Sequence, residues 1–180
     1  IKAIAETAAK ILNVEMVRFW MNDTGEYVCI DEYNAVSHKH YPKTGINERF
    51  NRIYEVNFEL KRQITIDDTL EADLPEDMAD VYARYNIRSV LYCPIRLRGN
   101  VVGAIAMADS KPRRWTVEDE SFVSSLADFT ALLLGLSELQ ESQRTMKTLL
   151  SNLPGMAFRL RSSSAELAFE FASEGSFELT

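Results

Sequence analysis

Two segments of alternating side chains flank Gly99-Asn100 and give the clearest structural signal in the chain. Glycine followed by asparagine can hold positive φ at both central positions of a two-residue hairpin turn. Such a turn pairs Arg98 with Val101, and the same register places Tyr92 opposite Met107. Alternation then sorts the side chains onto two faces. The first face is apolar and rich in alanine: Leu91, Cys93, Ile95, Leu97, Val102, Ala104, Ala106 and Ala108. The second is mixed: Val90, Tyr92, Arg96, Gly103, Ile105, Met107 and Asp109.

These two faces suit different neighbours. Alanine is small enough for a helix to lie close, so we expect helices on the first face. The mixed face suits a ligand pocket, because small-molecule sites combine apolar walls with a few convergent polar groups. The candidate ligand-binding residues are Arg18, Trp20, Tyr92, Ile105, Met107 and Asp109. Arg18 facing Asp109 can equally form an internal ion pair that closes the site.

Helical spacing of apolar residues predicts helices over residues 1–12, 48–62 and about 73–85. His38 and His40 lie in a segment without periodicity and have no Cys, Asp or Glu close by in sequence. We interpret them as solvated loop side chains. The acidic run from Asp67 to Asp80 lacks the Asp-x-Asp-x-Asp-Gly order of a calcium loop. The sequence therefore predicts no metal site.

A third pattern predicts one long helix from Thr116 to about Ser151. One apolar stripe near its start can close over the hairpin. A second stripe advances in alternating steps of three and four residues, as in a left-handed coiled coil. This dimer seam comprises Phe129, Leu132, Leu136, Leu139, Gln143, Met146 and Leu150. Two stripes on different faces require a second partner, and we predict a parallel homodimer.

Composition narrows the classes of function. The chain is 46% hydrophobic and 26% charged, as in ordinary globular proteins. A net charge of −7 argues against nucleic acid or an anionic membrane surface as the main partner. No signal peptide or membrane-spanning apolar run is evident, so no membrane insertion is expected in this segment. Two cysteines far apart in sequence, Cys29 and Cys93, are typical of a reduced cytoplasmic protein.

The segment Pro-Ile-Arg-Leu-Arg-Gly-Asn-Val-Val-Gly, with the following Trp-Thr-Val-Glu-Asp-Glu, resembles the C-terminal half of a GAF domain. GAF domains are small-molecule sensing modules of bacterial signalling proteins. The resemblance implies an α+β fold with a central antiparallel sheet of five or six strands. Its terminal helices cover one face, and a ligand pocket lies on the other. Many relatives have His-Glu-His where this chain has Met107-Ala108-Asp109, which removes two imidazoles from the predicted pocket face.

A second resemblance begins near Thr145. The segments Leu-Leu-Ser-Asn-Leu-Pro-Gly-Met-Ala-Phe-Arg and Phe-Ala-Ser-Glu-Gly-Ser-Phe-Glu-Leu-Thr look like the opening of a PAS domain. We therefore predict a GAF-like domain over residues 1–136, a connecting helix over 116–153 and a truncated PAS start over 154–180. Because the chain begins at Ile1 and stops within this motif, we expect a segment of a longer protein.

Comparison with GAF subfamilies adds one structural expectation. Cyclic-nucleotide-binding GAF domains carry Asn-Lys followed by Phe-x-x-x-Asp-Glu, and this chain has Ser110-Lys111 followed by Trp115-x-x-x-Asp119-Glu120. We predict that Lys111 and Asp119 form a structural ion pair. Light-sensing members commonly hold a bilin through a cysteine followed by histidine, a pair this chain lacks.

No motif of nucleophilic, phosphate-binding or metal-dependent catalysis is present in the sequence. We expect a non-catalytic sensory region of a bacterial signalling protein, of the sensor histidine kinase or diguanylate cyclase type. It would bind an unknown small molecule and relay the signal through the dimeric helix. No cofactor is evident. The alternative is a dimerisation and spacer module whose pocket is filled by its own side chains.

Overall fold

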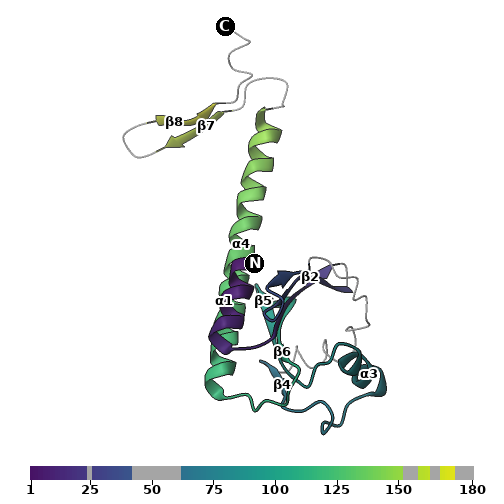
Figure 1. Cartoon of the computed structure of the whole chain (residues 1–180). Coiled ribbons are helices and arrows are strands. Elements are labelled where there is room, and N and C mark those ends of the chain that lie inside the picture. The colour runs from purple at the N-terminus through teal and green to yellow at the C-terminus, as the bar shows by residue number, and fades with distance from the viewer. Residues whose placement is uncertain (24–25, 42–61, 152–157, 163–166, 173–180) are drawn as a thin grey trace. The chain divides into compact units, whose positions relative to one another are not determined.

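The computed structural model describes residues 1–23, 26–41, 62–151, 158–162 and 167–172 (Figure 1). The chain divides into two compact units, Ile1–Leu133 and Leu134–Thr180. The predicted helix over residues 48–62 lies almost wholly outside the described residues.

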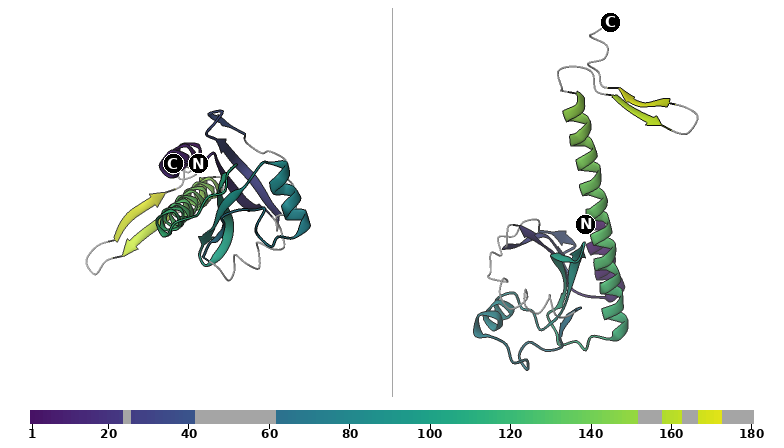
Figure 2. Two further views of the ribbon diagram at one scale, coloured as in Figure 1. Left: turned by 60° about the horizontal axis from the view of Figure 1, so that its bottom comes forward. Right: turned by 180° about the vertical axis from the view of Figure 1, so that it is seen from behind.

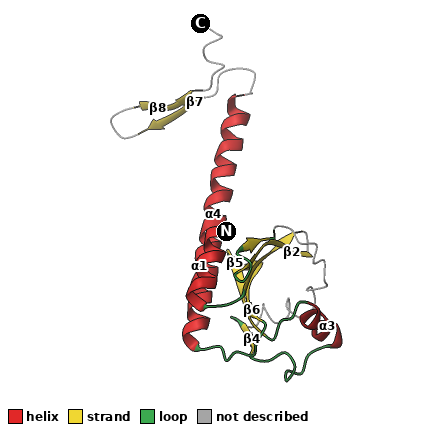
Figure 3. Ribbon diagram, viewed as in Figure 1, coloured by secondary structure: helices red, strands yellow, loops and turns green. Residues whose placement is uncertain are grey.

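The first unit is built on a six-stranded antiparallel sheet in the order β3-β2-β1-β6-β5-β4 (Figure 3). Its strands are β1 (Met16–Asp23), β2 (Glu26–Asn34), β3 (Lys39–His40), β4 (Ile64–Ile66), β5 (Ser89–Leu97) and β6 (Asn100–Asp109). β5 and β6 are buried in nearly continuous runs, as expected for strands that are covered on both faces, and β1 lies beside β6 in the centre of the sheet. This confirms the predicted sheet.

Helices cover both faces of this sheet. α1 (Lys2–Leu12) and the first turns of α4 (Val117–Ser151) lie side by side on one face, while α3 (Glu76–Arg84) lies on the other side (Figures 1 and 2). The residues that α1 and α4 bury include many small side chains: Ala5, Ala8, Ala9, Ser124, Ala127 and Ala131. The close approach of helix to sheet therefore depends on small residues of the helices.

The central hairpin differs from the predicted register. Its turn residues are Arg98 and Gly99, with φ of 53° and 86°, so the turn lies one residue earlier than expected. A β-bulge between Ile95 and Arg96 then shifts the pairing back by one residue, so that beyond the bulge the register differs from the prediction by one residue. The bulge exchanges the two faces of β6, because a one-residue slip moves every side chain to the opposite side.

Consequently, the predicted pairing of Tyr92 with Met107 is wrong. Tyr92 lies opposite Ala106, and Met107 lies opposite Leu91. Gly103 of β6 allows the close approach of β1 next to the bulge: a Cβ atom there would be 2.3 Å from the carbonyl oxygen of Trp20. The alanines of β6 therefore face away from α1 and α4, contrary to our expectation.

The second unit contains the remainder of α4 and a two-stranded antiparallel sheet. Its strands are β7 (Phe158–Ser162) and β8 (Leu167–Ala172). Residues 154–157, 163–166 and 173–180 of the predicted PAS segment lie outside the described residues.

By length and composition alone, residues Val117–Leu149 of α4 could cross a membrane. This differs from the expectation that no apolar run is long enough to span a bilayer. Core helices of globular proteins meet the same criteria. In the first unit this helix buries Val123, Ala127, Thr130 and Ala131, although only 22% of its most apolar stretch is buried.

An ion pair secures the loop that follows β4. Arg88 donates from Nε and Nη2 to the two carboxylate oxygens of Asp68, at 2.9 and 2.7 Å. These bonds and the backbone N–H of Leu70 lower the pKa of Asp68. The folded state therefore binds this proton less readily than the unfolded state. The stabilisation is complete above about pH 4 and is lost progressively as the pH falls below that value.

We expect Asp68→Asn to reduce stability at neutral pH and to have a progressively smaller effect as the pH falls below about 4. Urea unfolding midpoints measured across pH for the wild type and the variant test this. Asp73→Asn is the matched control, since Asp73 is an exposed carboxylate in the same acidic segment. A pH-independent difference between wild type and Asp68→Asn would contradict the assignment.

Candidate functional site

A row of three small side chains on β6 forms the floor of the candidate site. We call Ala104, Ala106 and Ala108 the alanine strip. Ala106 lies between Arg18 of β1 and Tyr92 of β5. Because an alanine side chain ends at Cβ, the strip lies low between the larger residues of the two neighbouring strands.

Large, mostly aromatic residues surround the alanine strip. Those buried with it in one cluster are Trp20, Tyr27, Cys29, Tyr82, Ile87, Val90 and Tyr92. Tyr82 comes from α3, and its hydroxyl lies 3.3 Å from that of Tyr92. Met78 and Tyr85, from the same part of the chain, pack against the cluster. α3 therefore brings an aromatic wall to the strip side of the sheet.

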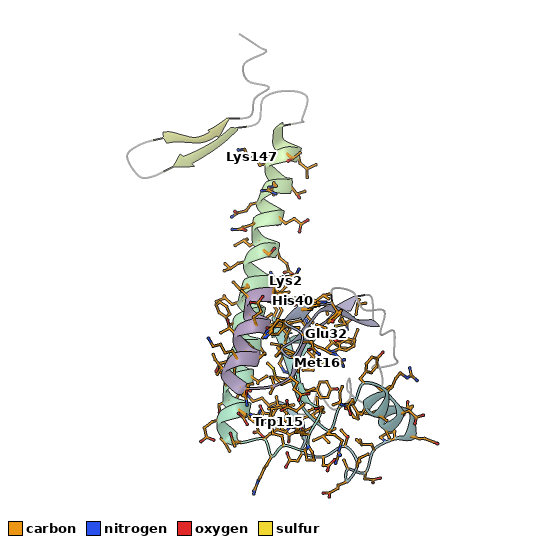
Figure 4. All side chains as sticks on the ribbon, in the orientation of Figure 1. Lys2, Met16, Glu32, His40, Trp115 and Lys147 are labelled. Carbon is orange, nitrogen blue, oxygen red and sulfur yellow. The ribbon has the colours of Figure 1, made fainter. Side chains whose placement is uncertain are left out.

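Arg18 is the charged group of this site and is only 6% exposed. Its Nε atom donates to Oε2 of Glu32 on β2 at 2.7 Å; Glu32 is labelled in Figure 4. Its guanidinium carbon lies 5.1 Å from the ring centroid of Tyr85, within cation–π range. The Nη2 atom of Arg18 is buried and has no hydrogen-bond partner among the described residues. The site thus holds a charged donor that is only partly satisfied.

The structure separates the six predicted ligand-binding residues. Arg18, Trp20 and Tyr92 lie on the strip side of the sheet, as expected. Ile105 and Met107 lie fully buried on the opposite face, beneath the terminal helices. Their predicted place in the pocket is wrong because the bulge in β5 and β6 exchanges the faces.

Asp109 is also displaced from the predicted site. It accepts a hydrogen bond from the backbone N–H of Glu15 at 2.8 Å and lies 3.5 Å from Nη1 of Arg113. The proposed Arg18–Asp109 ion pair is therefore wrong, and Glu32 takes its place. A glutamate at an alternating position of residues 27–33 was the available signal for this partner.

The predicted ion pair between Lys111 and Asp119 is wrong as well. Nη2 of Arg113 binds the two carboxylate oxygens of Asp119 at 3.2 and 3.3 Å. Lys111 is exposed and forms no ion pair with a described residue. Asp119 also forms a capping box with Thr116, through two hydrogen bonds of 3.1 Å.

His40 is not the solvated loop residue that the sequence suggested. Its Nδ1 lies 2.9 Å from Oδ2 of the buried Asp31, and its Nε2 lies 3.0 Å from Oε1 of Glu6. The imidazole therefore links β2 and β3 to α1. We assign His40 a structural role, because both ring nitrogens are engaged by protein carboxylates.

The thiols offer little nucleophilic chemistry. Cys29 and Cys93 are both buried and free. Burial raises the pKa of the Cys93 thiol, which reduces the fraction of reactive thiolate. Cys93 contacts the Ser124 hydroxyl of α4 at 3.8 Å, on the face away from the alanine strip. The described residues contain no group of three or more side chains that could hold a metal ion.

Comparisons with known proteins place the chain in one family. The sequence profile of the GAF domain matches residues 1–134, and the chain belongs to the GAF domain family. GAF domains are sensory and signalling modules, generally non-catalytic and typically soluble. No curated protein sequence matches the chain.

Several solved structures share the fold at low sequence identity. GAF3 from Slr1393 of Synechocystis sp. PCC6803, in its photoproduct state, has a TM-score of 0.67 and 14% identity, covering 78% of this chain and 94% of that one. The cyanobacteriochrome TePixJ GAF domain has a TM-score of 0.66 and 17% identity, covering 76% and 88%. A domain of a putative two-component sensor histidine kinase from Sinorhizobium meliloti 1021 has a TM-score of 0.62 and 10% identity, covering 79% and 94%.

Proposed function

We propose that this GAF domain is a non-catalytic sensory input that binds a small molecule over the alanine strip. The observation that carries the proposal is the partly satisfied guanidinium of Arg18, buried beside a floor of alanines and among aromatic walls. An unsatisfied buried donor costs stability in the empty protein, and a ligand oxygen would remove that cost. The parent protein is a bacterial signalling protein of the sensor histidine kinase or diguanylate cyclase type, located in the cytoplasm.

The signal would leave the domain through α4. Five seam residues are large, apolar and exposed in the single chain: Phe129, Leu132, Leu136, Leu139 and Met146. Together with Gln143 they follow the heptad spacing of a coiled coil on one continuous helix. We propose that two copies pair in parallel along this seam. The residues after the helix, from about position 154, would begin a PAS domain that receives the signal.

One observation favours a rival function. Trp20 and Tyr92 are only 2% and 4% exposed, so large side chains already occupy much of the strip side. If these side chains fill the site completely, the domain is a dimerisation and spacer module that binds no ligand.

Native mass spectrometry of the purified protein separates these two functions. We expect the wild type to carry a copurified small molecule and Ala106→Leu to lose it, because the longer side chain fills the floor of the site. Ala79→Leu is the matched control, since Ala79 is exposed on α3. Circular dichroism confirms that each variant is folded. If the wild type, like Ala106→Leu, shows only the mass of the protein without a bound molecule, the spacer function would be favoured.

A further inference from the structure

The Arg18–Glu32 pair leaves one donor and one acceptor unused. Nη2 of Arg18 has no hydrogen-bond partner among the described residues. Glu32 is held only through Oε2, and the structure shows no hydrogen bond from a described residue to its Oε1. A buried polar group without a partner is uncommon in folded proteins. Nη2 of Arg18 is such a buried group. A bound molecule that accepts a hydrogen bond from Nη2 and donates one to the free Oε1 of Glu32 would complete the arrangement.

We propose that the site recognises the edge of an uncharged lactam ring, in which a carbonyl and an N–H are adjacent. The carbonyl oxygen would accept from Nη2 of Arg18, and the ring N–H would donate to Oε1 of Glu32. This inference rests on the proposed ligand site over the alanine strip and names the chemical class of its ligand.

Charge explains why the ligand is neutral. Glu32 lies 2.7 Å from Arg18 and already neutralises its positive charge, and both side chains are almost buried, at 12% and 7% exposure. A ligand carboxylate would be attracted by Arg18 but repelled by Glu32 at nearly the same distance. It would also have to lose its hydration without a net gain in charge pairing. A carbonyl oxygen satisfies the donor without either cost.

The surroundings of the pair suit the flat body of such a ring. Ala106 directly adjoins Arg18 across the sheet, so the floor next to the guanidinium is low. Tyr85 lies against the guanidinium, and the Tyr82 and Tyr92 rings border the other side of the strip. Aromatic walls above a floor of small side chains favour a planar, mainly apolar molecule.

Equilibrium dialysis against four related probes tests the proposal. Carbostyril presents the lactam edge, N-methylcarbostyril lacks the N–H, naphthalene lacks both polar groups, and quinaldate carries a carboxylate. We expect carbostyril to bind at least about tenfold more tightly than each of the others, the factor typical of a hydrogen bond to a charged group.

Three variants identify the atoms responsible. Arg18→Lys keeps the charge but removes Nη2, and we expect it to lose the preference for carbostyril over naphthalene. Glu32→Gln leaves the charge of Arg18 uncompensated, and we expect quinaldate to become the tighter ligand. Arg114→Lys is the matched control, because Arg114 is exposed, and we expect it to bind all four probes like the wild type. Thermal unfolding of each variant establishes that it is folded.

Two results would overturn the proposal. One is equal binding of carbostyril and naphthalene, or no binding of carbostyril at all. The other is a preference for carbostyril that survives in Arg18→Lys. Neither result removes the proposed sensory function, which fails only if the native mass spectrum also shows a bare protein. The two failures are therefore distinguishable.

Discussion

Arg113→Met is expected to lower the free energy of unfolding by about 2–4 kcal/mol, because three parts of the fold meet at this guanidinium. Its Nη1 donates to the backbone carbonyl of Leu12 at the end of α1, at 2.8 Å. The same nitrogen lies 3.5 Å from Asp109 at the end of β6, and Nη2 binds Asp119 in the first turn of α4.

The magnitude follows from what the substitution leaves behind. Asp109 and Asp119 are only 13% and 14% exposed, so both carboxylates would lose a charged partner while remaining mostly shielded from water. The guanidinium also lies 4.7 Å from the ring centroid of Trp115, which Figure 4 places beside the start of α4. Methionine keeps an apolar side chain of similar length against this ring, so the measured loss reports chiefly on the polar contacts.

Urea or guanidinium unfolding at neutral pH measures this effect, with Lys111→Met as the matched control. Lys111 is exposed and forms no ion pair with a described residue, so its substitution should change stability by no more than about 0.5 kcal/mol. Equal destabilisation by the two substitutions would contradict the role assigned to Arg113.

Leu139→Asp is expected to convert a dimer into a monomer, with the dissociation constant raised by at least about 100-fold. Leu139 is 54% exposed in the single chain and occupies a central position of the seam, three residues after Leu136. In a parallel pair the two aspartates would face each other across an apolar interface. Each would then be desolvated next to a like charge.

Sedimentation velocity over a range of concentrations measures this change. Ser137→Asp adds the same charge to the same turn of α4 but away from the seam, and we expect it to remain dimeric. A dimer that survives Leu139→Asp, or one that Ser137→Asp also abolishes, would place the interface elsewhere. The relay through a coiled coil would then have to be abandoned, whereas the ligand site would be unaffected.

The elements of the first unit could largely be predicted from sequence, because their periodicity is local. β1, β5 and β6 carry apolar runs bounded by turn residues, and α1 and α4 show helical stripes of apolar residues. The segment Thr116-Val-Glu-Asp119 at the start of α4 has the pattern of a capping box. Each of these signals depends on residues a few positions apart, and neighbours in the chain are sufficient to establish it.

Only half of the predicted site residues lie on the expected side of the sheet. The reason is the one extra residue that the β-bulge introduces into the pairing of β5 with β6. Arg18, Trp20 and Tyr92 were placed correctly because each was assigned from alternation within its own strand. Ile105 and Met107 were misplaced because their side depends on the register between two strands, and the bulge near Ile95 changes that register. No local pattern in the sequence predicts the bulge.

The sequence by itself determined the GAF fold and the long helix, and it singled out Arg18, Trp20 and Tyr92 as candidate residues of one site. Only the tertiary structure decided which partners the charged groups take. Asp119 forms its ion pair with Arg113 rather than with Lys111, and Arg18 forms its ion pair with Glu32 rather than with Asp109. Sequence spacing cannot distinguish between these alternative partners, because the competing side chains have the same charge and similar length. They differ only in the direction in which the backbone orients them. That direction follows from strand register and packing, which involve residues far apart along the chain.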